Sequence, residues 1–138
     1  MIIMSVDLGR VRTGLAVCDR TEILASPLKV IEERKREVLL QKVAACAAEC
    51  KAELIVVGLP KNMDDSEGES AIYAREFAAE LGQISGLPVD MRDERGTTIT
   101  AHNYLNTTNV RGKKRKAAVD AVAAVIILQD YIDARKNK

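Results

Sequence analysis

The stretch Ile2-Ile3-Met4-Ser5-Val6-Asp7-Leu8-Gly9 decides the fold, because a short β-rich run ends there in an acid and a turn. Ile2 to Leu8 predicts a first strand, and Gly9 to Thr13 predicts a tight turn. Thr13 to Cys18 predicts a second strand, and Ile23 to Ile31 a third, with Pro27 indicating a sheet edge or a bend. Links this short predict an antiparallel meander.

The rest of the chain predicts alternating helices and strands. They are a helix from Glu32 to Cys50, a strand from Leu54 to Val57, a loop from Gly58 to Gly68, a helix from Glu69 to Ile84, a strand from Pro88 to Arg92, a short helix from Thr97 to Leu105, a loop from Thr107 to Gly112 and a long helix from Lys113 to Arg135. This order predicts an α/β fold, with a mixed five-stranded sheet and helices on both faces. The 138 residues fit a single domain over 1–138.

The composition is that of a soluble globular protein, with 47% hydrophobic and 30% charged residues. Aromatic residues are only 3%, so a platform of exposed rings for base stacking is not expected. The apolar N-terminal run is too short for a signal peptide and Asp7 interrupts it, while no stretch approaches the roughly 20 apolar residues of a membrane span. A cytoplasmic protein without membrane association is therefore expected.

The three cysteines contain no Cys-x-x-Cys pair, which argues against a disulfide framework and a zinc site. Cys46 and Cys50 are four residues apart in an Ala-rich predicted helix, so we expect two buried thiols on one helix face.

Acidic residues at three distant places carry the functional argument. Asp7 ends the first strand, Asp93-Glu94 follows the fifth, and Asp120 lies inside an apolar helix. An ionised carboxylate is costly to bury unless it is paired, hydrogen-bonded or bound to a metal. If the first, fourth and fifth strands run parallel and close together, Asp7, Gly58 and Asp93-Glu94 meet at one edge. Three converging acids would bind divalent cations, which suit phosphoryl chemistry.

Each acid also has a purely structural interpretation. Asp7 could belong to a capped turn, Asp93-Glu94 to a charge cluster at a strand end, and Asp120 could favour a helix start through the macrodipole. Neighbouring residues of a strand face opposite ways, so only one of Asp93 and Glu94 can point at a shared site. Glu94 is favoured, although alternation alone leaves that choice open.

Cationic and amide side chains near these acids are candidate contacts to a phosphate backbone. They are Arg10, Arg12, Lys61, Asn62, Arg95, Arg111, Lys113, Lys114, Arg115 and Lys116. The net charge of +1 gives no global basic field, so a local patch would carry such binding. His102, the single histidine, is interpreted as an exposed side chain rather than a base or ligand.

Five separated motifs, in this order, resemble the YqgF/RuvX family, a ribonuclease H-like group of proposed Holliday junction resolvases and pre-16S ribosomal RNA nucleases. They are Asp7-Leu8-Gly9 with Arg12-Thr13-Gly14, Gly58-Leu59-Pro60 with Asn62-Met63, Ser66-Glu67-Gly68, Asp93-Glu94-Arg95 with Thr97-Thr98, and Lys114-Arg115-Lys116 with Val119-Asp120-Ala121. The resemblance covers nearly the whole chain and implies a ribonuclease H-like fold.

The resemblance further implies a cytoplasmic nuclease that matures the 5′ end of 16S ribosomal RNA. It assigns catalysis and the binding of one or two Mg²⁺ or Mn²⁺ ions to Asp7, Glu94 and Asp120. Related junction resolvases carry their second carboxylate at the end of the fourth strand, where this chain has Gly58. The second acid is therefore expected from the adjacent fifth strand.

The expected activity is hydrolysis of phosphodiester bonds in structured nucleic acid, either pre-rRNA or branched DNA, with ribosomal particles as a further partner. One alternative is a DNA endonuclease like the Holliday junction resolvases, and another is a ribosome-assembly factor that binds nucleic acid without cleaving it. A phosphotransferase of the actin and sugar-kinase type is a weaker alternative, because that architecture needs two such domains. A monomer or a weak homodimer is expected, since the third strand could pair across an edge.

Overall fold

A computed structural model describes residues 1–60, 68–93 and 113–136, with residues 113–120 described as helical backbone only. Its elements, in chain order, are β1 (Ile3–Asp7), β2 (Arg12–Cys18), β3 (Ala25–Glu32), α1 (Arg36–Glu49), β4 (Leu54–Leu59), α2 (Glu69–Ser85), β5 (Val89–Asp93) and α4 (Lys113–Lys136). The helix expected over 97–105 and the loop expected over 107–112 lie outside the described residues.

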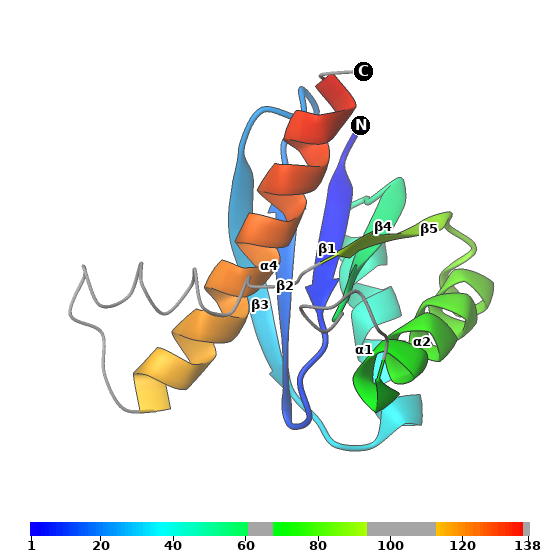
Figure 1. Cartoon of the computed structure of the whole chain (residues 1–138). Coiled ribbons are helices and arrows are strands. Elements are labelled where there is room, and N and C mark those ends of the chain that lie inside the picture. Colours follow the sequence, from blue (N-terminus) through cyan, green and yellow to red (C-terminus); the bar gives the residue numbers. More distant parts are fainter. Residues whose placement is uncertain (61–67, 94–112, 137–138) are drawn as a thin grey trace.

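The strands form one five-stranded sheet in the order β3-β2-β1-β4-β5, which confirms the predicted mixed sheet (Figure 1). β1 lies at its centre, antiparallel to β2 and parallel to β4. β4 in turn pairs with β5 in parallel. The first, fourth and fifth strands are therefore adjacent and run in the same direction, as the convergence of the three acids requires.

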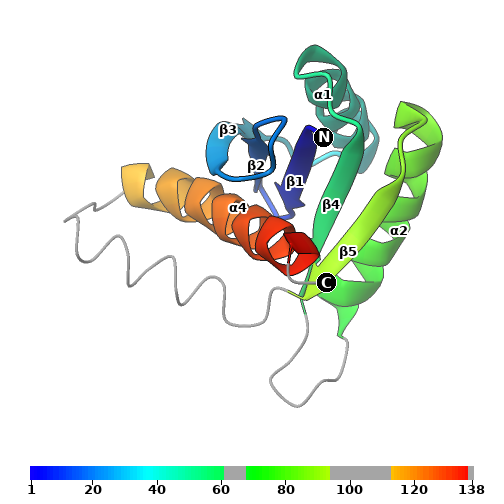
Figure 2. The same ribbon diagram turned by 90° about the horizontal axis from the view of Figure 1, so that it is seen from above.

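Helices cover both faces of the sheet, as Figure 2 shows from above. α1 and α2 pack together on one face, and α4 crosses the other face over β1, β2 and β3. We call these the α1–α2 face and the α4 face. Apolar side chains fill both layers: Met4 and Val6 of β1 belong to the α1–α2 core, and Ile3 belongs to the α4 core.

Several element boundaries differ from the sequence prediction by a few residues, and strand pairing explains two of the differences. Gly58 and Leu59 were predicted to begin a loop, but they extend β4 because they pair with Arg92 and Asp93 of β5. Glu32 was predicted to begin a helix, but it pairs with Arg12 of β2. In each case a partner strand overrides the local sequence preference.

The turn between β1 and β2 depends on Gly9. A Cβ atom at this position would lie 2.1 Å from the backbone oxygen of Arg12, closer than any side chain tolerates. The predicted tight turn is thus confirmed at Gly9, where its geometry excludes every residue except glycine, although Arg12 and Thr13 belong to β2 and not to the turn.

β3 is an edge strand, as Pro27 indicated. Lys29 pairs with Leu15 and Pro27 pairs with Ala16, so Leu28 is an extra residue that forms a β-bulge. A bulge, a proline without an N–H group and an exposed lysine are features that discourage pairing with a further strand.

Candidate active site at the carboxyl edge of the sheet

The parallel strands bring three chain segments to one edge of the sheet. β1 ends at Asp7, β4 at Leu59 and β5 at Asp93. Val6 pairs with Val57, so Asp7 lies level with Gly58, the next residue of β4. Gly58 is paired in turn with Arg92 of β5. Because carboxyl ends of adjacent parallel strands are the usual ligand-binding positions of such sheets, this edge is the candidate active site.

Asp7 lies on the α4 face of β1. Two residues earlier, the Ser5 hydroxyl donates a hydrogen bond to the backbone oxygen of Ala124 in α4, at 2.7 Å. Val6, between them, packs into the opposite core. Side chains two apart on a strand share a face, so Asp7 follows Ser5 towards α4. Its antiparallel partner across the sheet is Gly14, which places no side chain beside it.

Contacts from β5 to α4 fix which residues of that strand share this face. The Tyr131 hydroxyl donates to a carboxylate oxygen of Asp90 at 2.7 Å. The Arg92 guanidinium donates to Asp130, with the shorter N–O distance being 2.9 Å. Asp90 and Arg92 therefore face α4, and burial of the Tyr131 side chain raises the pKa of its phenol, with the Asp90 contact adding to the shift.

Asp93 has the opposite orientation. Val89 and Met91 pack against the α1–α2 core, and Asp93 continues their alternation. The last residue of β5 therefore lies on the α1–α2 face, whereas Asp7 lies on the α4 face. Of the two adjacent acids considered for the second ligand, Asp93 is directed away from the face that carries Asp7.

α4 runs opposite to β1. At the far edge of the sheet, Glu22 accepts a hydrogen bond from the Met1 amino group at 3.0 Å and another from Arg135 Nε at 2.7 Å. The C-terminal end of α4 thus lies beside the start of β1, as Figure 1 also shows.

The Ser5–Ala124 hydrogen bond is therefore a fixed point from which positions along β1 and along α4 can be compared. Two residues further along β1, about 6.6 Å, is Asp7. Four residues back along α4, about 6 Å and one turn, is position 120. Both steps lead towards the carboxyl edge. Ala124 is fully buried against the sheet, and positions four apart share a helix face.

The other predicted site residues are placed as follows. Arg10 is exposed in the β1–β2 turn, and Arg12 is half-buried at the start of β2. α4 includes five of the predicted residues, for which only the backbone is described: Lys113, Lys114, Arg115, Lys116 and Asp120. Outside the described residues lie Lys61, Asn62, Glu94, Arg95, His102 and Arg111. Among the described side chains, which exclude those of Glu94 and Asp120, no group of three acidic, histidine or cysteine residues could hold a metal.

The prediction of two buried thiols on one helix face is confirmed for Cys46 and wrong for Cys50, which follows the last residue of α1 and is half-buried. Cys18 and Cys46 are buried and Cys50 is half-buried, and none forms a disulfide. Burial raises the pKa of all three thiols, so each is protonated near neutral pH and is a poor nucleophile or ligand.

Sequence reasoning missed three residues of this edge. Ser5 had a readable signal, because it is the one hydroxyl residue in the apolar run from Ile2 to Val6. Arg34 and Tyr73 line a pocket together with Arg10, but they lie in different segments and belong to no motif. Only folding of the chain brings Arg10, Arg34 and Tyr73 together.

Comparison with known proteins agrees with this architecture. The family model RuvX, described as Holliday junction resolvase, matches residues 1–134. A protein of Anaeromyxobacter sp. strain Fw109-5 named "Putative pre-16S rRNA nuclease" is 45% identical over 132 residues, which is 96% of each chain. A protein of the same name from Mycolicibacterium paratuberculosis is 37% identical over 134 residues, covering 96% of this chain and 80% of that one.

Among solved structures, Thermus thermophilus RuvC in complex with a Holliday junction substrate superposes with a TM-score of 0.64 at 17% identity. The superposition covers 100% of this chain and 97% of RuvC, and it confirms the ribonuclease H-like fold. Within the described part of the chain, no helix has the length and apolarity to span a membrane. By its sequence and its fold, the chain belongs to the RuvX family.

Proposed function

We propose that this protein is a divalent-metal-dependent nuclease that hydrolyses phosphodiester bonds of structured nucleic acid, with the 5′ end of pre-16S rRNA as its leading substrate. Its family and its relatives at 37–45% identity support a hydrolase acting on nucleic acid. The observation that carries the site is the Ser5–Ala124 hydrogen bond, from which β1 and α4 both lead to the carboxyl edge. A cytoplasmic location and ribosomal particles as partners belong to the same proposal.

The proposed ligands are Asp7, Glu94 and Asp120. Carboxylate oxygens are the donors that Mg²⁺ and Mn²⁺ prefer, so this set fits one or two such ions. Asp7 supports the set because it is directed to the α4 face. After Arg92, the next position of β5 whose alternation favours that face is 94, which is why we assign Glu94 rather than Asp93.

Gly58 supports the assignment from the middle strand. It pairs with Arg92 and lies level with Asp7, and having no side chain it leaves the α4 face of β4 open between β1 and β5. No side chain of β4 therefore stands between Asp7 and an acid that follows β5 on this face. In this chain the fifth strand would supply the acid that related resolvases carry on the fourth.

Divalent ions held by these carboxylates would supply a nucleophilic water and offset the charge that builds on the phosphorane. The protein's own task is to hold the three carboxylates in place and to position the backbone of the substrate. Basic residues predicted from the sequence would position the backbone through charge-assisted hydrogen bonds to phosphate oxygens: Arg10, Arg12, Arg95, Arg111 and Lys113–Lys116.

Replacing Asp120 tests the proposal. We expect Asp120→Asn to reduce Mn²⁺-dependent cleavage of precursor 16S RNA by at least about 100-fold, because a ligand charge is lost while the shape is kept. Asp133→Asn is the matched control, since Asp133 lies on the same helix and its contact to Gln129 needs only an acceptor. Undiminished turnover by purified Asp120→Asn would exclude its role as a ligand.

The resolvase function is the second candidate, favoured by the family description and by the likeness to RuvC. The same assay should therefore include a four-way DNA junction and single strands, with and without Mn²⁺. Preferential cleavage of the junction would support the resolvase. Binding that persists in EDTA without any cleavage product would instead support a ribosome-assembly factor without nuclease activity.

A further inference from the structure

A pocket of about 340 Å³ opens at the same edge of the sheet, next to the β1–β2 turn. Its walls come from that turn, from the segment before α1, from the residue after β4 and from the first two turns of α2. The volume falls within the usual range for small-ligand sites. Leu8 packs against the α1–α2 core, so the pocket lies on the face opposite to Asp7.

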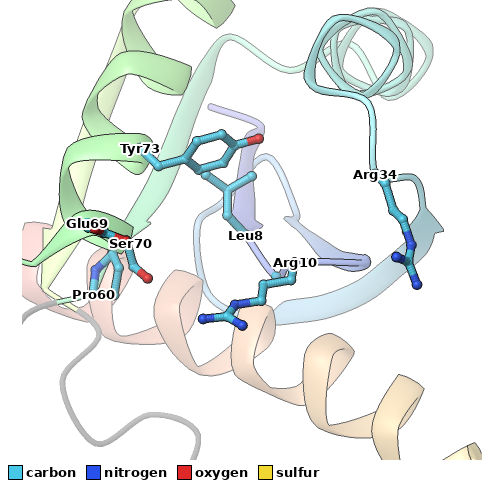
Figure 3. A pocket seen from close by; sticks show the side chains of 8 residues that line it. Leu8, Arg10, Arg34, Pro60, Glu69, Ser70 and Tyr73 are labelled. Atoms are coloured by element: carbon cyan, nitrogen blue, oxygen red, sulfur yellow. The ribbon is translucent and has the colours of Figure 1, made fainter.

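The middle of the pocket is apolar. Figure 3 shows the Tyr73 ring above the Leu8 side chain, with Pro60 on the α2 side. The Tyr73 ring is held in place before any ligand binds, because the Arg36 guanidinium carbon lies 5.3 Å from its centroid. Arg36 is itself tied to Glu76 of α2 at 3.2 Å. An ordered ring beside an aliphatic side chain is a suitable surface for a flat base.

Two arginines at the rim supply positive charge. Arg10 and Arg34 are exposed, and neither guanidinium group forms a hydrogen bond or ion pair with a residue that the structure describes. Arg36 differs from them, because Glu76 and Glu80 neutralise it. Guanidinium groups left without a carboxylate are suited to bind phosphate oxygens, often through two parallel hydrogen bonds.

The polar groups are separated across the pocket. In Figure 3, Glu69 and Ser70 lie on the α2 side, while Arg34 lies on the other side and Arg10 extends below Leu8. A carboxylate and a hydroxyl can bond with the edge of a base, whereas an anion would be repelled by Glu69 and attracted by Arg34. This distribution matches a nucleotide better than a free inorganic anion.

We infer that this pocket binds one unpaired nucleotide of the nucleic-acid strand, with its base against Leu8 and Tyr73 and its phosphate between Arg10 and Arg34. The inference rests on the proposed function, because the strand is taken to be the substrate. Leu8 directly follows Asp7, so the pocket and the carboxylate site share the β1–β2 turn but open on opposite faces. A strand that reaches both sites must bend over the turn with one base unstacked.

Binding measured without catalysis tests the inference. A fluorescein-labelled single-stranded RNA of about ten nucleotides is titrated in EDTA with the full chain, using fluorescence anisotropy at several salt concentrations. We expect Arg34→Ala to weaken binding by about 5- to 10-fold and to lower the salt slope by about 0.7, as for one lost phosphate contact. Arg20→Ala is the matched control, because Arg20 is an exposed arginine of the β2–β3 turn, at the other edge of the sheet.

A second measurement locates the base. The same RNA carrying 4-thiouridine is photo-crosslinked to the wild-type chain, and we expect the crosslinked peptides to contain Leu8 or Tyr73. Equal affinities of Arg34→Ala and Arg20→Ala, or crosslinks confined to other segments, would overturn the inference. Complete displacement of the RNA from the protein by AMP would assign the pocket to free nucleotides. That result would also overturn the inference. Nuclease activity with Mn²⁺ is a separate readout, so failure of the proposed function is distinguishable from failure of the pocket.

Discussion

The Ser5 hydroxyl and the backbone oxygen of Ala124 lie 2.7 Å apart, and this hydrogen bond joins the central strand to α4. Both residues are fully buried, so water cannot replace either partner. A carbonyl oxygen has two lone pairs and can accept the Ser5 hydroxyl in addition to the hydrogen bond of its own helix. The bond therefore fixes where α4 lies along β1, and with it the separation between Asp7 and position 120.

We expect Ser5→Ala to lower the free energy of unfolding by about 1 kcal/mol, which is the usual contribution of one buried hydrogen bond. We also expect the Mn²⁺ concentration that half-saturates cleavage to rise several-fold, because α4 is no longer held in position over Asp7. Urea unfolding and a Mn²⁺ titration of activity measure the two effects. The second effect would not appear if Ser5 contributed to stability alone.

Thr13→Val is the control for Ser5→Ala. Thr13 is also fully buried in the sheet, but among the described residues its hydroxyl has no hydrogen-bond partner. Removing an unsatisfied hydroxyl should leave stability unchanged or raise it by about 1 kcal/mol. A Mn²⁺ titration of Ser5→Ala that coincides with that of Thr13→Val would show that α4 keeps its place without the bond.

Much of the fold could be predicted from the sequence because local patterns agreed with the pairing partners. The β1 strand has an apolar run with one acid at its end, and the Gly9 turn is too tight for any other residue. The prediction was wrong at Gly58 and Glu32, where local preference favoured a loop and a helix. Pairing with Arg92 and Arg12 keeps those two residues in strands, and pairing between distant segments is not encoded locally.

The candidate site was predictable to a smaller extent. Asp7 could be proposed because an acid that ends an apolar strand needs a reason to be there. The sequence favoured Glu94 over Asp93 without deciding between them; contacts such as that between Arg92 and Asp130 direct Asp93 away from the face of Asp7, and the assignment of Glu94 stays a prediction. Arg10 of the pocket was a candidate from the sequence, but Arg34 and Tyr73 had no sequence signal, since they come from segments that only the folded chain brings beside Arg10.

A comparison of two strand-end acids tests which face carries the chemistry. We expect Asp7→Asn to abolish Mn²⁺-dependent cleavage to less than about 1% of wild type, because it removes a ligand charge. Asp93→Asn should retain cleavage within about 3-fold, because Asp93 lies on the α1–α2 face. Single-turnover cleavage rates at saturating substrate distinguish the two variants. An equal loss in both would mean that Asp93, and not only its neighbour, contributes to the metal site.

The ion pair at the opposite edge gives the protein a pH dependence. The Arg135 hydrogen bond lowers the pKa of Glu22, and the Met1 amino group adds to this, while partial burial of Glu22 acts in the opposite direction. The folded protein therefore binds this proton less readily than the unfolded chain. The contribution of Glu22 to the free energy of unfolding is complete above the ordinary glutamate pKa of about 4.5. It is lost as the pH falls through the lower pKa that Glu22 has in the folded protein.

We expect Glu22→Gln to lower the free energy of unfolding by about 1 kcal/mol at pH 7. The effect is small because Arg135 is partly exposed to solvent, which weakens the ion pair. The difference from wild type should shrink as the pH falls below 4.5. Urea unfolding at pH 7, 4.5 and 3 measures it. Asp19 nearby also titrates in this acidic range, because hydrogen bonds from the Thr21 hydroxyl and the Ile23 N–H hold its pKa at about 2. A constant difference at all three pH values would show that Glu22 contributes by packing rather than by charge.

The end of α1 offers a stabilising substitution. Lys51 has a φ of 59°, in the left-handed region where side chains are disfavoured. The Ala52 N–H donates to the Ala47 oxygen at 2.9 Å, and the Lys51 N–H donates to the Ala48 oxygen at 3.2 Å. This pair of bonds is the Schellman ending, in which the left-handed position is usually glycine. The helix ending is therefore well formed, and a lysine occupies its glycine position.

We expect Lys51→Gly to raise the free energy of unfolding by about 1 kcal/mol, because glycine adopts this conformation without steric cost. Gly86→Ala is the reverse substitution, because it removes a glycine from a left-handed helix end: Gly86 follows α2 with a φ of 71°. An alanine there meets no atom within 4 Å, so its expected loss of about 1 kcal/mol would come from the backbone alone. Urea unfolding of both variants measures the two changes with opposite signs. If Lys51→Gly were neutral while Gly86→Ala lost stability, the aliphatic part of Lys51 would have to contribute packing that offsets its backbone strain.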